Sequence, residues 1–304
     1  MESFHGHSKI SITRLNPQRL NGWLAYLSIY VILAGCALNK PSDLGAHDLR
    51  LYVLDCGYMD MQDWPAFQQL YGVPESVVAI PAQANPCFLI VNDGRSLLWD
   101  AGLSDATPRQ PTQSAFGVKF EMPNKLKAQM EALGVPTSEL DYFALSHLHF
   151  DHVGNWAYFK HVETLLQRDE WTAAIQPGDK GIGYDDKITN GFKEYEKLTL
   201  LDGDHDVFGD GFVTLVSTPG HTEGHQALII KLQEYGPVII SGDAIHFAEE
   251  LEHNVLPTFN TSADQSKASL QKLLELEASL GGELWIQHDP VQHQQRRIAP
   301  EFYR

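Results

Sequence analysis

Three histidines and one aspartate lie within six residues of one another, between positions 147 and 152. They directly follow an apolar run, Asp141–Leu145, that predicts a buried strand. In extended backbone, residues two apart point the same way, so His147 and His149 can bind one ion. Asp151 and His152 would then turn toward a second ion. Because imidazole and carboxylate are typical ligands of zinc and similar ions, this chain is expected to fold around a metal centre.

Three further ligand-type residues each follow an apolar run that predicts a strand. They are His221 after Val213–Ser217, Asp243 after Val238–Ser241 and His288 after Glu283–Ile286. A single residue of this kind usually caps a strand or lies in the core. Three in the same context, downstream of the first cluster, are better explained by convergence on one site. His225, four residues after His221, is expected to have a structural role beside the ligands.

Apolar runs separated by turn signals predict a strand-rich fold with interspersed helices. Besides the four runs above, the expected strands are Leu51–Asp55, Val77–Ile80, Cys87–Val91, Ser96–Asp100, Glu163–Gln167 and Gln226–Leu232. The expected helices are Asn124–Leu133, Asp169–Ile175 and Ser262–Leu280. Residues 176–205 are rich in Gly, Asp and Lys without a clear period, and we interpret them as a surface insertion. This order suggests two sheets sandwiched between helices.

The N-terminus predicts an export signal. Basic residues precede an apolar run, Trp23–Gly35, that is too short to span a bilayer and is typical of a signal-peptide core. It ends Leu33-Ala34-Gly35-Cys36, similar to a bacterial lipobox, in which the signal is cut before a cysteine that is then acylated. We therefore expect a lipoprotein signal peptide over 1–35, a linker over 36–47 and one folded domain over 48–304. The alternative is a chance cysteine in an uncleaved anchor.

This lipobox predicts a location in the cell envelope. Acylation of Cys36 would hold the protein in the periplasm by a lipid anchor, as its one contact with the membrane. Ala37 follows the cysteine, which favours sorting to the outer membrane. Export also permits a disulfide between the two remaining cysteines, Cys56 and Cys87, although two buried free thiols are equally compatible with the sequence.

Composition limits the partners. The net charge is −17 and no cluster of Lys and Arg occurs, which excludes a nucleic-acid surface. Hydrophobic residues make up 43% of the chain and charged residues 20%, as in ordinary globular proteins. The roughly 265 residues left after the signal are enough for one large domain.

The order of the ligand-type residues resembles the metallo-β-lactamase superfamily. The resemblance covers roughly residues 48–290 and includes Leu98-Trp99-Asp100-Ala101-Gly102, which is similar to an early strand–Asp–x–Gly segment of that family. It implies an α/β fold of four layers, an αββα sandwich. It also implies two divalent metal ions, expected to be zinc. The implied ligand sets are His147, His149 and His221 for one ion, Asp151, His152 and His288 for the other, and Asp243 as the bridge.

Within that family, the segments around the ligands look most like the N-acyl-homoserine lactonases. The segments are 146–155, Gln167-Arg168-Asp169-Glu170, 218–226 and Gln287-His288-Asp289. Class B β-lactamases usually carry another residue where His152 stands, and ribonuclease Z requires a basic surface. The resemblance therefore implies hydrolysis of N-acyl-homoserine lactones, and so quorum quenching. Two bound ions would supply hydroxide near neutral pH, and Asp151 would pass a proton to the leaving alkoxide.

The substrate-binding residues are expected on both sides of the metals. Several of those lactonases carry a tyrosine three residues after the bridging aspartate, where this chain has His246. A neutral histidine can donate the same hydrogen bond to a substrate carbonyl, and its ordinary pKa is near 6.5, so it would titrate in the working range. An apolar wall for the acyl chain is expected after the first strand, where the substrate-contacting loop of that family lies. Its residues are Met59, Met61, Trp64 and Phe67.

Two alternatives stay open at this point. Another two-metal hydrolase of the same superfamily, an esterase, thioesterase or phosphotriesterase, would keep the metals and change the pocket. A non-enzymatic metal-binding lipoprotein would fill every ligand position with protein, whereas a zinc hydrolase keeps one open for water. For an enzyme of either kind the partner is a small lactone or ester. Acyl-chain preference, the native metal and a homodimer are left open by the sequence.

Overall fold

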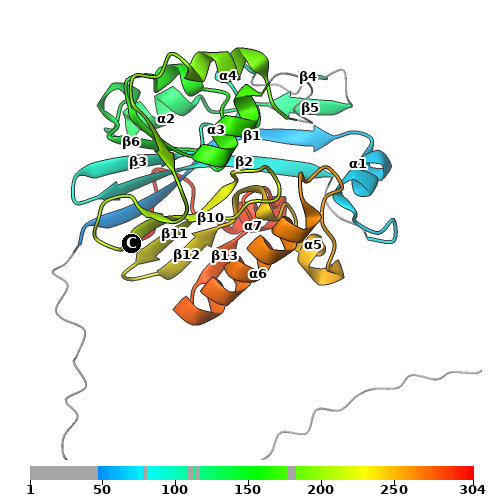
Figure 1. The fold of residues 1–304 in the computed structure, drawn as a ribbon. Coiled ribbons are helices and arrows are strands. Elements are labelled where there is room, and N and C mark those ends of the chain that lie inside the picture. Colours follow the sequence, from blue (N-terminus) through cyan, green and yellow to red (C-terminus); the bar gives the residue numbers. More distant parts are fainter. Residues whose placement is uncertain (1–46, 78–80, 109–111, 114–116, 177–182) are drawn as a thin grey trace, which may run out of the picture. The chain divides into compact units, whose positions relative to one another are not determined.

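The computed structural model describes residues 47–77, 81–108, 112–113, 117–176 and 183–304 (Figure 1). The expected signal peptide, Cys36 and nearly all of the linker lie outside the described residues, as do residues 78–80 of the strand expected over Val77–Ile80. Residues Gly45–Arg304 form one unit by their internal contacts. Within the described ranges, we find no helix with both the length and the apolar character needed to cross a membrane.

The larger sheet has eight strands in the order β4-β5-β1-β2-β3-β6-β7-β8. Its strands are β1 (Leu49–Met61), β2 (Ala82–Asn92), β3 (Arg95–Trp99), β4 (Thr112–Gln113), β5 (Val118–Glu121), β6 (Tyr142–Ala144), β7 (Glu163–Gln167) and β8 (Leu198–Leu201). β1, β2 and β3 are antiparallel, and a tight turn at Asp93-Gly94 joins the last two. β3, β6, β7 and β8 are parallel, so their carboxyl ends meet at one edge of the sheet.

The smaller sheet has five strands in the order β13-β12-β11-β10-β9. They are β9 (His205–Asp206), β10 (Val213–Ser217), β11 (Gln226–Leu232), β12 (Gly236–Ile240) and β13 (Glu283–Trp285). β12 and β13 are the parallel pair, and the helix α6 (Ala263–Leu280) lies in the crossover between them. Ser262 caps that helix and Gly281, in the left-handed region, ends it.

Helices cover the outer faces of both sheets (Figure 1). α2 (Leu126–Ala132), α3 (Arg168–Ile175) and α4 (Asp186–Phe192) lie over the larger sheet. α5 (Ala248–His253) and α6 lie on the side of the smaller sheet, and α1 (Trp64–Tyr71) links β1 to β2. α7 (Pro290–Gln295) follows β13. Short 3-10 turns occur at η1 (Thr137–Glu139), η2 (Trp156–Tyr158) and η3 (Gly242–Ala244).

Alternation along the strands divides the core into layers. In β1, Leu51 and Val53 belong to the cluster between the two sheets, whereas Tyr52 and Leu54 belong to the cluster under α2, α3 and α4. In β11, Leu228 faces the larger sheet and Ile229 packs in the cluster with α6. Because successive side chains of a strand point to opposite faces, each sheet buries both of its faces. The predicted four-layer αββα sandwich is confirmed.

Residues 176–205, interpreted from the sequence as a surface insertion, contribute to the larger sheet. They contain α4 and β8, and β8 pairs in parallel with β7 as the last strand of the larger sheet. An edge strand is paired on one side only and is here partly exposed, so its apolar residues do not alternate cleanly. β4, β5, α1, α5 and α7 were also not predicted.

β1 extends six residues beyond the predicted end at Asp55. A bulge between Asp55 and Tyr58 interrupts its pairing with β2, and Gly57 takes a φ of 122° there. A Cβ at Gly57 would lie 2.6 Å from the Leu103 side chain, so only glycine fits this bend. As a result Met59 and Met61 lie within the strand and not in a loop after it.

Candidate metal centre

The ligand-type residues converge from four strand ends. The segment 147–152 follows β6, and the other three residues follow β10, β12 and β13. They form two buried groups, in each of which one ligand atom per residue lies within 4.8 Å of the others. The first group is His147, His149, His221 and Asp243, and the second is Asp151, His152 and His288. All seven predicted residues therefore come together.

The first group has the spacing of a tetrahedral site. His221 Nε2 lies 3.2 Å from His147 Nε2 and 3.1 Å from His149 Nδ1. Asp243 Oδ2 lies 3.4 Å from His221 Nε2 and 3.7 Å from His147 Nε2. A zinc ion with ligands at about 2.0–2.1 Å separates neighbouring ligand atoms by about 3.3 Å. Four unprotonated donors at these distances fit one such ion.

The second group shares Asp243 with the first. His288 Nε2 lies 3.1 Å from His152 Nε2, and both lie close to Asp243 Oδ1, at 3.0 and 3.1 Å. Asp151 Oδ2 completes the group at 3.6 Å from His152 Nε2 and 3.7 Å from His288 Nε2. Asp243 thus presents Oδ2 to one group and Oδ1 to the other. Its Oδ1 is buried and accepts no hydrogen bond from the described residues, as expected of an oxygen atom that would bind a cation.

In three of these histidines the outward-facing ring nitrogen lies beside an oxygen atom. Such a partner fixes the tautomer, because the outer nitrogen carries the proton and the inner nitrogen keeps its lone pair for a metal. The pairs are His152 Nδ1 with Asp100 Oδ2 at 2.8 Å, His288 Nδ1 with the Ala84 carbonyl at 2.7 Å, and His221 Nδ1 with Asn260 Oδ1 at 3.1 Å.

The electrostatic environment favours neutral histidines and an ionised Asp243. Burial lowers the pKa of His149 to about 4, and it lowers the pKa of His147 and His221 well below the usual value. These rings are therefore neutral near pH 7, the form that binds a metal. Burial alone would raise the pKa of Asp243, but the surrounding histidines, with His152 the strongest, hold it well below its usual value. Asp243 is therefore a carboxylate.

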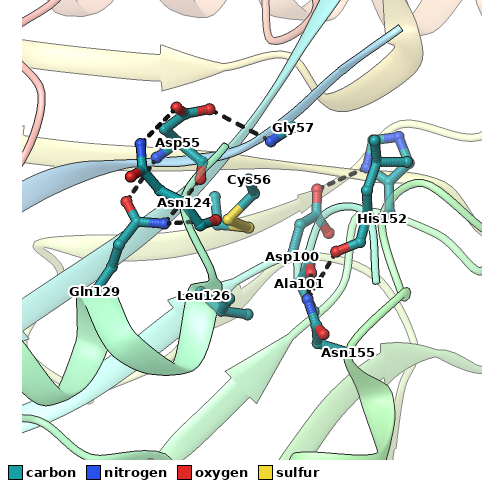
Figure 2. Close-up of a disulfide and its surroundings, with 12 residues drawn as sticks. Asp55, Cys56, Gly57, Asp100, Ala101, Asn124, Leu126, Gln129, His152 and Asn155 are labelled. Atoms are coloured by element: carbon teal, nitrogen blue, oxygen red, sulfur yellow. Dashed lines mark hydrogen bonds and ion pairs between the residues drawn. A yellow bond between two sulfur atoms is a disulfide. The ribbon is translucent and has the colours of Figure 1, made fainter. Parts of the chain in front are cut away.

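Asp100 holds the second group from behind, a role that the sequence analysis did not assign. It is fully buried and adopts a φ of 58°, a region that costs energy for a residue with a side chain. Its carboxylate accepts hydrogen bonds from Ser146 N at 2.8 Å and from Gln287 Nε2 at 2.7 Å, besides its bond with His152. Figure 2 shows the pairing with His152. Asp100 therefore connects the loops after β3, β6 and β13.

Glu170 connects two ligand loops on the other side and was also missed as a functional residue. Its carboxylate accepts hydrogen bonds from Leu148 N at 2.8 Å, Gly224 N at 3.2 Å and the Tyr184 hydroxyl at 2.9 Å. A Cβ at Gly224 would lie 2.0 Å from Glu170 N, so the approach requires glycine. The sequence contained Glu170 in a family-like segment, but a single carboxylate at the start of a helix indicates only a helix N-terminus.

His225 has the structural role expected for it. It lies outside both ligand groups. Its Nε2 accepts a hydrogen bond from Asp243 N at 2.8 Å, and its Nδ1 lies 3.0 Å from the Thr218 carbonyl. Both ring nitrogens are thus used, and His225 positions the backbone of Asp243.

His246 lies in the site wall, but between two carboxylates. Its Nε2 is 3.2 Å from Asp243 Oδ2 and its Nδ1 is 3.4 Å from Glu250 Oε1. Burial lowers its pKa, but the carboxylates of Glu250 and Asp243 outweigh burial and raise the pKa to about 10. These two carboxylates act against the expected titration of His246 near neutral pH, because both ring nitrogens face negative charge. Its role as a substrate donor stays a prediction.

A cavity of about 740 Å³ connects the metal centre to an apolar wall. His149, Asp151, His221, Asp243 and His246 line one side of it. The apolar lining residues are Met59, Met61, Ala66, Phe67, Leu70, Val118, Phe120, Phe150 and Phe259. Three of the four predicted wall residues are thus present. Trp64 is not among the lining residues, because its ring packs edge-on against Phe247 with 5.9 Å between centroids.

Cys56 and Cys87 form a disulfide between β1 and β2, which decides a question that the sequence left open. The disulfide packs against the chain that follows Asp100: a Cβ at Gly102 would lie 2.3 Å from Cys56 Cβ. Figure 2 shows Cys56 beside the segment that carries Asp100 and Ala101. The Ala101 N–H donates to the His152 carbonyl at 2.6 Å, so the disulfide supports a segment in direct contact with the metal centre.

A family model described as the metallo-beta-lactamase superfamily matches residues 81–280. Among characterised relatives, the N-acyl homoserine lactonase AttM of Rhizobium radiobacter is 30% identical over 267 residues, covering 84% of this chain and 99% of the relative. The N-acyl homoserine lactonase AiiA of Bacillus thuringiensis subsp. kurstaki is 24% identical over 223 residues, covering 71% of this chain and 85% of the relative.

Solved structures with the same fold include an N-acyl homoserine lactone hydrolase with N-hexanoyl-L-homoserine bound at its catalytic metal centre. It has a TM-score of 0.69 and 22% identity, and the alignment covers 83% of this chain and 98% of the other. The dizinc quorum-quenching lactonase AidC has a TM-score of 0.62 and 17% identity, with 84% and 94% covered. At these identities the structural similarity establishes the shared fold.

Proposed function

This chain belongs to the metallo-β-lactamase superfamily, and we propose that it is a dinuclear metal-dependent hydrolase that opens the ring of N-acyl-homoserine lactones. The observation that carries the proposal is the pair of ligand groups joined by Asp243, which share one cavity with an apolar wall. The relatives named as N-acyl homoserine lactonases support the substrate class. The protein would thereby act in quorum quenching.

The ligand set suits two divalent ions, and we propose zinc. When bound, such ions lower the pKa of water to near 7 and polarise an ester carbonyl. The chain itself places Asp151 at the edge of the second group, with one carboxylate oxygen held by Asn85 Nδ2 at 3.2 Å. Asp151 also lines the cavity, so it is placed to pass a proton to the leaving alkoxide.

The cavity suits a ligand with a polar head and a flexible apolar tail. Its size lies within the usual range for small-molecule sites, about 300–1,000 Å³. Met59 and Met61 supply adaptable apolar surface on one side, and Phe67 and Phe150 supply rings. A neutral acyl lactone also avoids repulsion from the net charge of −17, which acts against anionic substrates.

The test is a substrate panel on the purified metal-loaded protein. We expect hydrolysis of N-acyl-homoserine lactones with kcat/KM at least about tenfold above that for aryl esters, thioesters and phosphotriesters, because even one methylene group in an apolar pocket contributes about 1–3 kcal/mol. Metal analysis of the same sample should find about two ions per chain. Preference for another ester class would replace the lactone assignment, and hydrolysis of none would support a metal-binding lipoprotein.

We also propose that the protein is a lipid-anchored periplasmic protein, modified at Cys36. The buried disulfide supports this proposal, because such bonds persist mainly in oxidising compartments. In the native host, Cys36→Ala should release the protein from membranes into the soluble periplasmic fraction. Attachment of the wild type should resist washing with high salt, unlike adsorption by charge. An unprocessed N-terminus in the mass spectrum of the native protein would contradict the proposal.

A further inference from the structure

A hydrogen-bond donor to the substrate carbonyl would assist the proposed hydrolysis, and His246 is poorly placed to be that donor. Both nitrogens of the His246 ring face carboxylates, Asp243 on one side and Glu250 on the other. Glu250 also accepts a hydrogen bond from the His246 backbone N–H at 3.1 Å, which keeps its carboxylate beside the ring. To turn a ring nitrogen toward a substrate, His246 would have to move that nitrogen away from a buried carboxylate, which is costly.

Tyr71, the last residue of α1, lies directly beside His246. Its ring meets the His246 ring edge-on, with 5.1 Å between centroids, and packs in the same way against Phe247 and Phe259. These three contacts hold the ring in one orientation. Tyr71 lines the same cavity as Asp151, His221 and Asp243 although it is only 8% exposed, so its small accessible surface faces that shared cavity.

Gln83 on β2 orients the Tyr71 hydroxyl. The Gln83 side-chain amide donates a hydrogen bond to the Tyr71 oxygen at 3.0 Å, so the phenolic proton must point elsewhere. Within the described part of the chain, that hydroxyl donates no hydrogen bond of its own. Asn85 lies two residues farther along the same strand, on the same face, and donates to Asp151. One strand face therefore positions both Tyr71 and Asp151.

The hydroxyl keeps its proton in this environment. Burial raises the pKa of Tyr71 well above the usual value of a phenol, and the nearby carboxylates of Asp243 and Glu250 raise it further. A buried hydroxyl with a free proton, next to a site that binds carbonyl compounds, is a hydrogen-bond donor without an acceptor.

We propose that Tyr71 is a catalytic residue, whose hydroxyl donates a hydrogen bond to the carbonyl oxygen of the substrate. This inference rests on the proposed hydrolysis of a lactone or ester. Water adds to the carbonyl carbon, the carbonyl oxygen gains negative charge, and the acyl–oxygen bond then breaks as the leaving oxygen takes up a proton. A donor that faces this oxygen stabilises its charge as it forms. Gln83 is a positioning residue that acts through Tyr71.

The decisive variant is Tyr71→Phe, which keeps the ring and its packing and removes only the hydroxyl. With N-hexanoyl-L-homoserine lactone, we expect kcat to fall about 30- to 100-fold and KM to change less than about threefold, because the bond strengthens in the transition state. Metal content should stay at the wild-type value. The affinity for the product N-hexanoyl-L-homoserine, measured by calorimetry, should fall by about fivefold or more, because a hydrogen bond to a carboxylate is lost.

The matched control is Tyr195→Phe, which removes a buried tyrosine hydroxyl that donates to the Trp156 carbonyl, outside the cavity. It should leave kcat within about twofold of wild type. When Tyr71 is present, Gln83→Leu should lower kcat by about three- to tenfold, because the Tyr71 hydroxyl loses the hydrogen bond that orients it. It should have no further effect in the Tyr71→Phe background, since two residues that act through one bond are not additive.

Wild-type turnover of Tyr71→Phe would overturn this inference. Loss of activity in His246→Asn alongside such a result would return the donor role to His246. A wrong substrate assignment is distinguishable from a wrong role of Tyr71, because the wild-type protein would then fail to hydrolyse lactones in the substrate panel. The kcat of Tyr71→Phe would then be compared with that of the wild type on the ester that the wild type hydrolyses. Equal kcat values on that ester would also overturn the role of Tyr71.

Discussion

His221→Ala should lower turnover of the proposed lactone substrate by more than about 10³-fold and reduce the metal content from about two ions per chain toward one. His221 is the residue on which the first ligand group is centred, with Nε2 3.1–3.4 Å from ligand atoms of His149, His147 and Asp243. Without it, only three protein ligands remain for that ion. Loss of an ion that polarises the carbonyl and activates water removes several kcal/mol of transition-state stabilisation, and 10³-fold corresponds to about 4 kcal/mol.

The measurements are steady-state kinetics and elemental analysis of the same preparation. His161→Ala, an exposed histidine outside both ligand groups, is the matched control and should retain two ions and wild-type kcat. Thermal unfolding of both variants separates metal loss from misfolding. Full activity of wild-type protein that contains fewer than one ion per chain would exclude a two-metal mechanism.

Removal of the disulfide should lower the free energy of unfolding by about 3–4 kcal/mol. Cys56 and Cys87 are 31 residues apart, and in the chain-entropy model a cross-link over such a loop stabilises the folded state by about 3.5 kcal/mol. Both cysteines are fully buried, so serine at either position would also leave a hydroxyl in an apolar cluster. Cys56→Ala/Cys87→Ala is therefore the cleaner variant.

Denaturant unfolding with and without a thiol reductant checks this prediction. When it is reduced under unfolding conditions, the wild-type protein should lose most of its extra free energy of unfolding relative to the double variant. The free energy of unfolding of the double variant should not change with the reductant. The same stability for wild type and double variant, under oxidising conditions, would show that the bond contributes nothing. Because the disulfide packs against Gly102, next to the Asp100 segment, metal retention by the double variant at moderate temperature is measured in parallel.

The metal ligands could be found in the sequence because each carries its own local signal. A histidine or aspartate directly after an apolar strand lies at a sheet edge, and such edges are where ligands gather in sandwiched sheets. The spacing of His147 and His149 alone indicated a shared direction. The strands β10 and β11 were predicted with their observed bounds, since both alternate or run apolar over their whole length.

The contacts between segments far apart in the chain were decided by the tertiary structure. Asp100 meets His152 across 52 residues and Gln287 across 187, and its place in the segment Leu98-Trp99-Asp100-Ala101-Gly102 does not indicate either partner. Trp64 was assigned to the cavity by its position after a strand, but helix α1 turns its ring onto Phe247 and presents Phe67 and Tyr71 to the cavity instead.

Sequence by itself determined the layered fold, the seven ligand-type residues and the chemistry that they can hold, because periodicity and residue type are local properties of the chain. The tertiary structure alone decided that Cys56 and Cys87 pair, that His246 lies between two carboxylates, and that the Tyr71 hydroxyl accepts a hydrogen bond from Gln83. Each of these depends on the distance between atoms brought together by packing, and hydrogen bonds and disulfides form only within a narrow range of such distances.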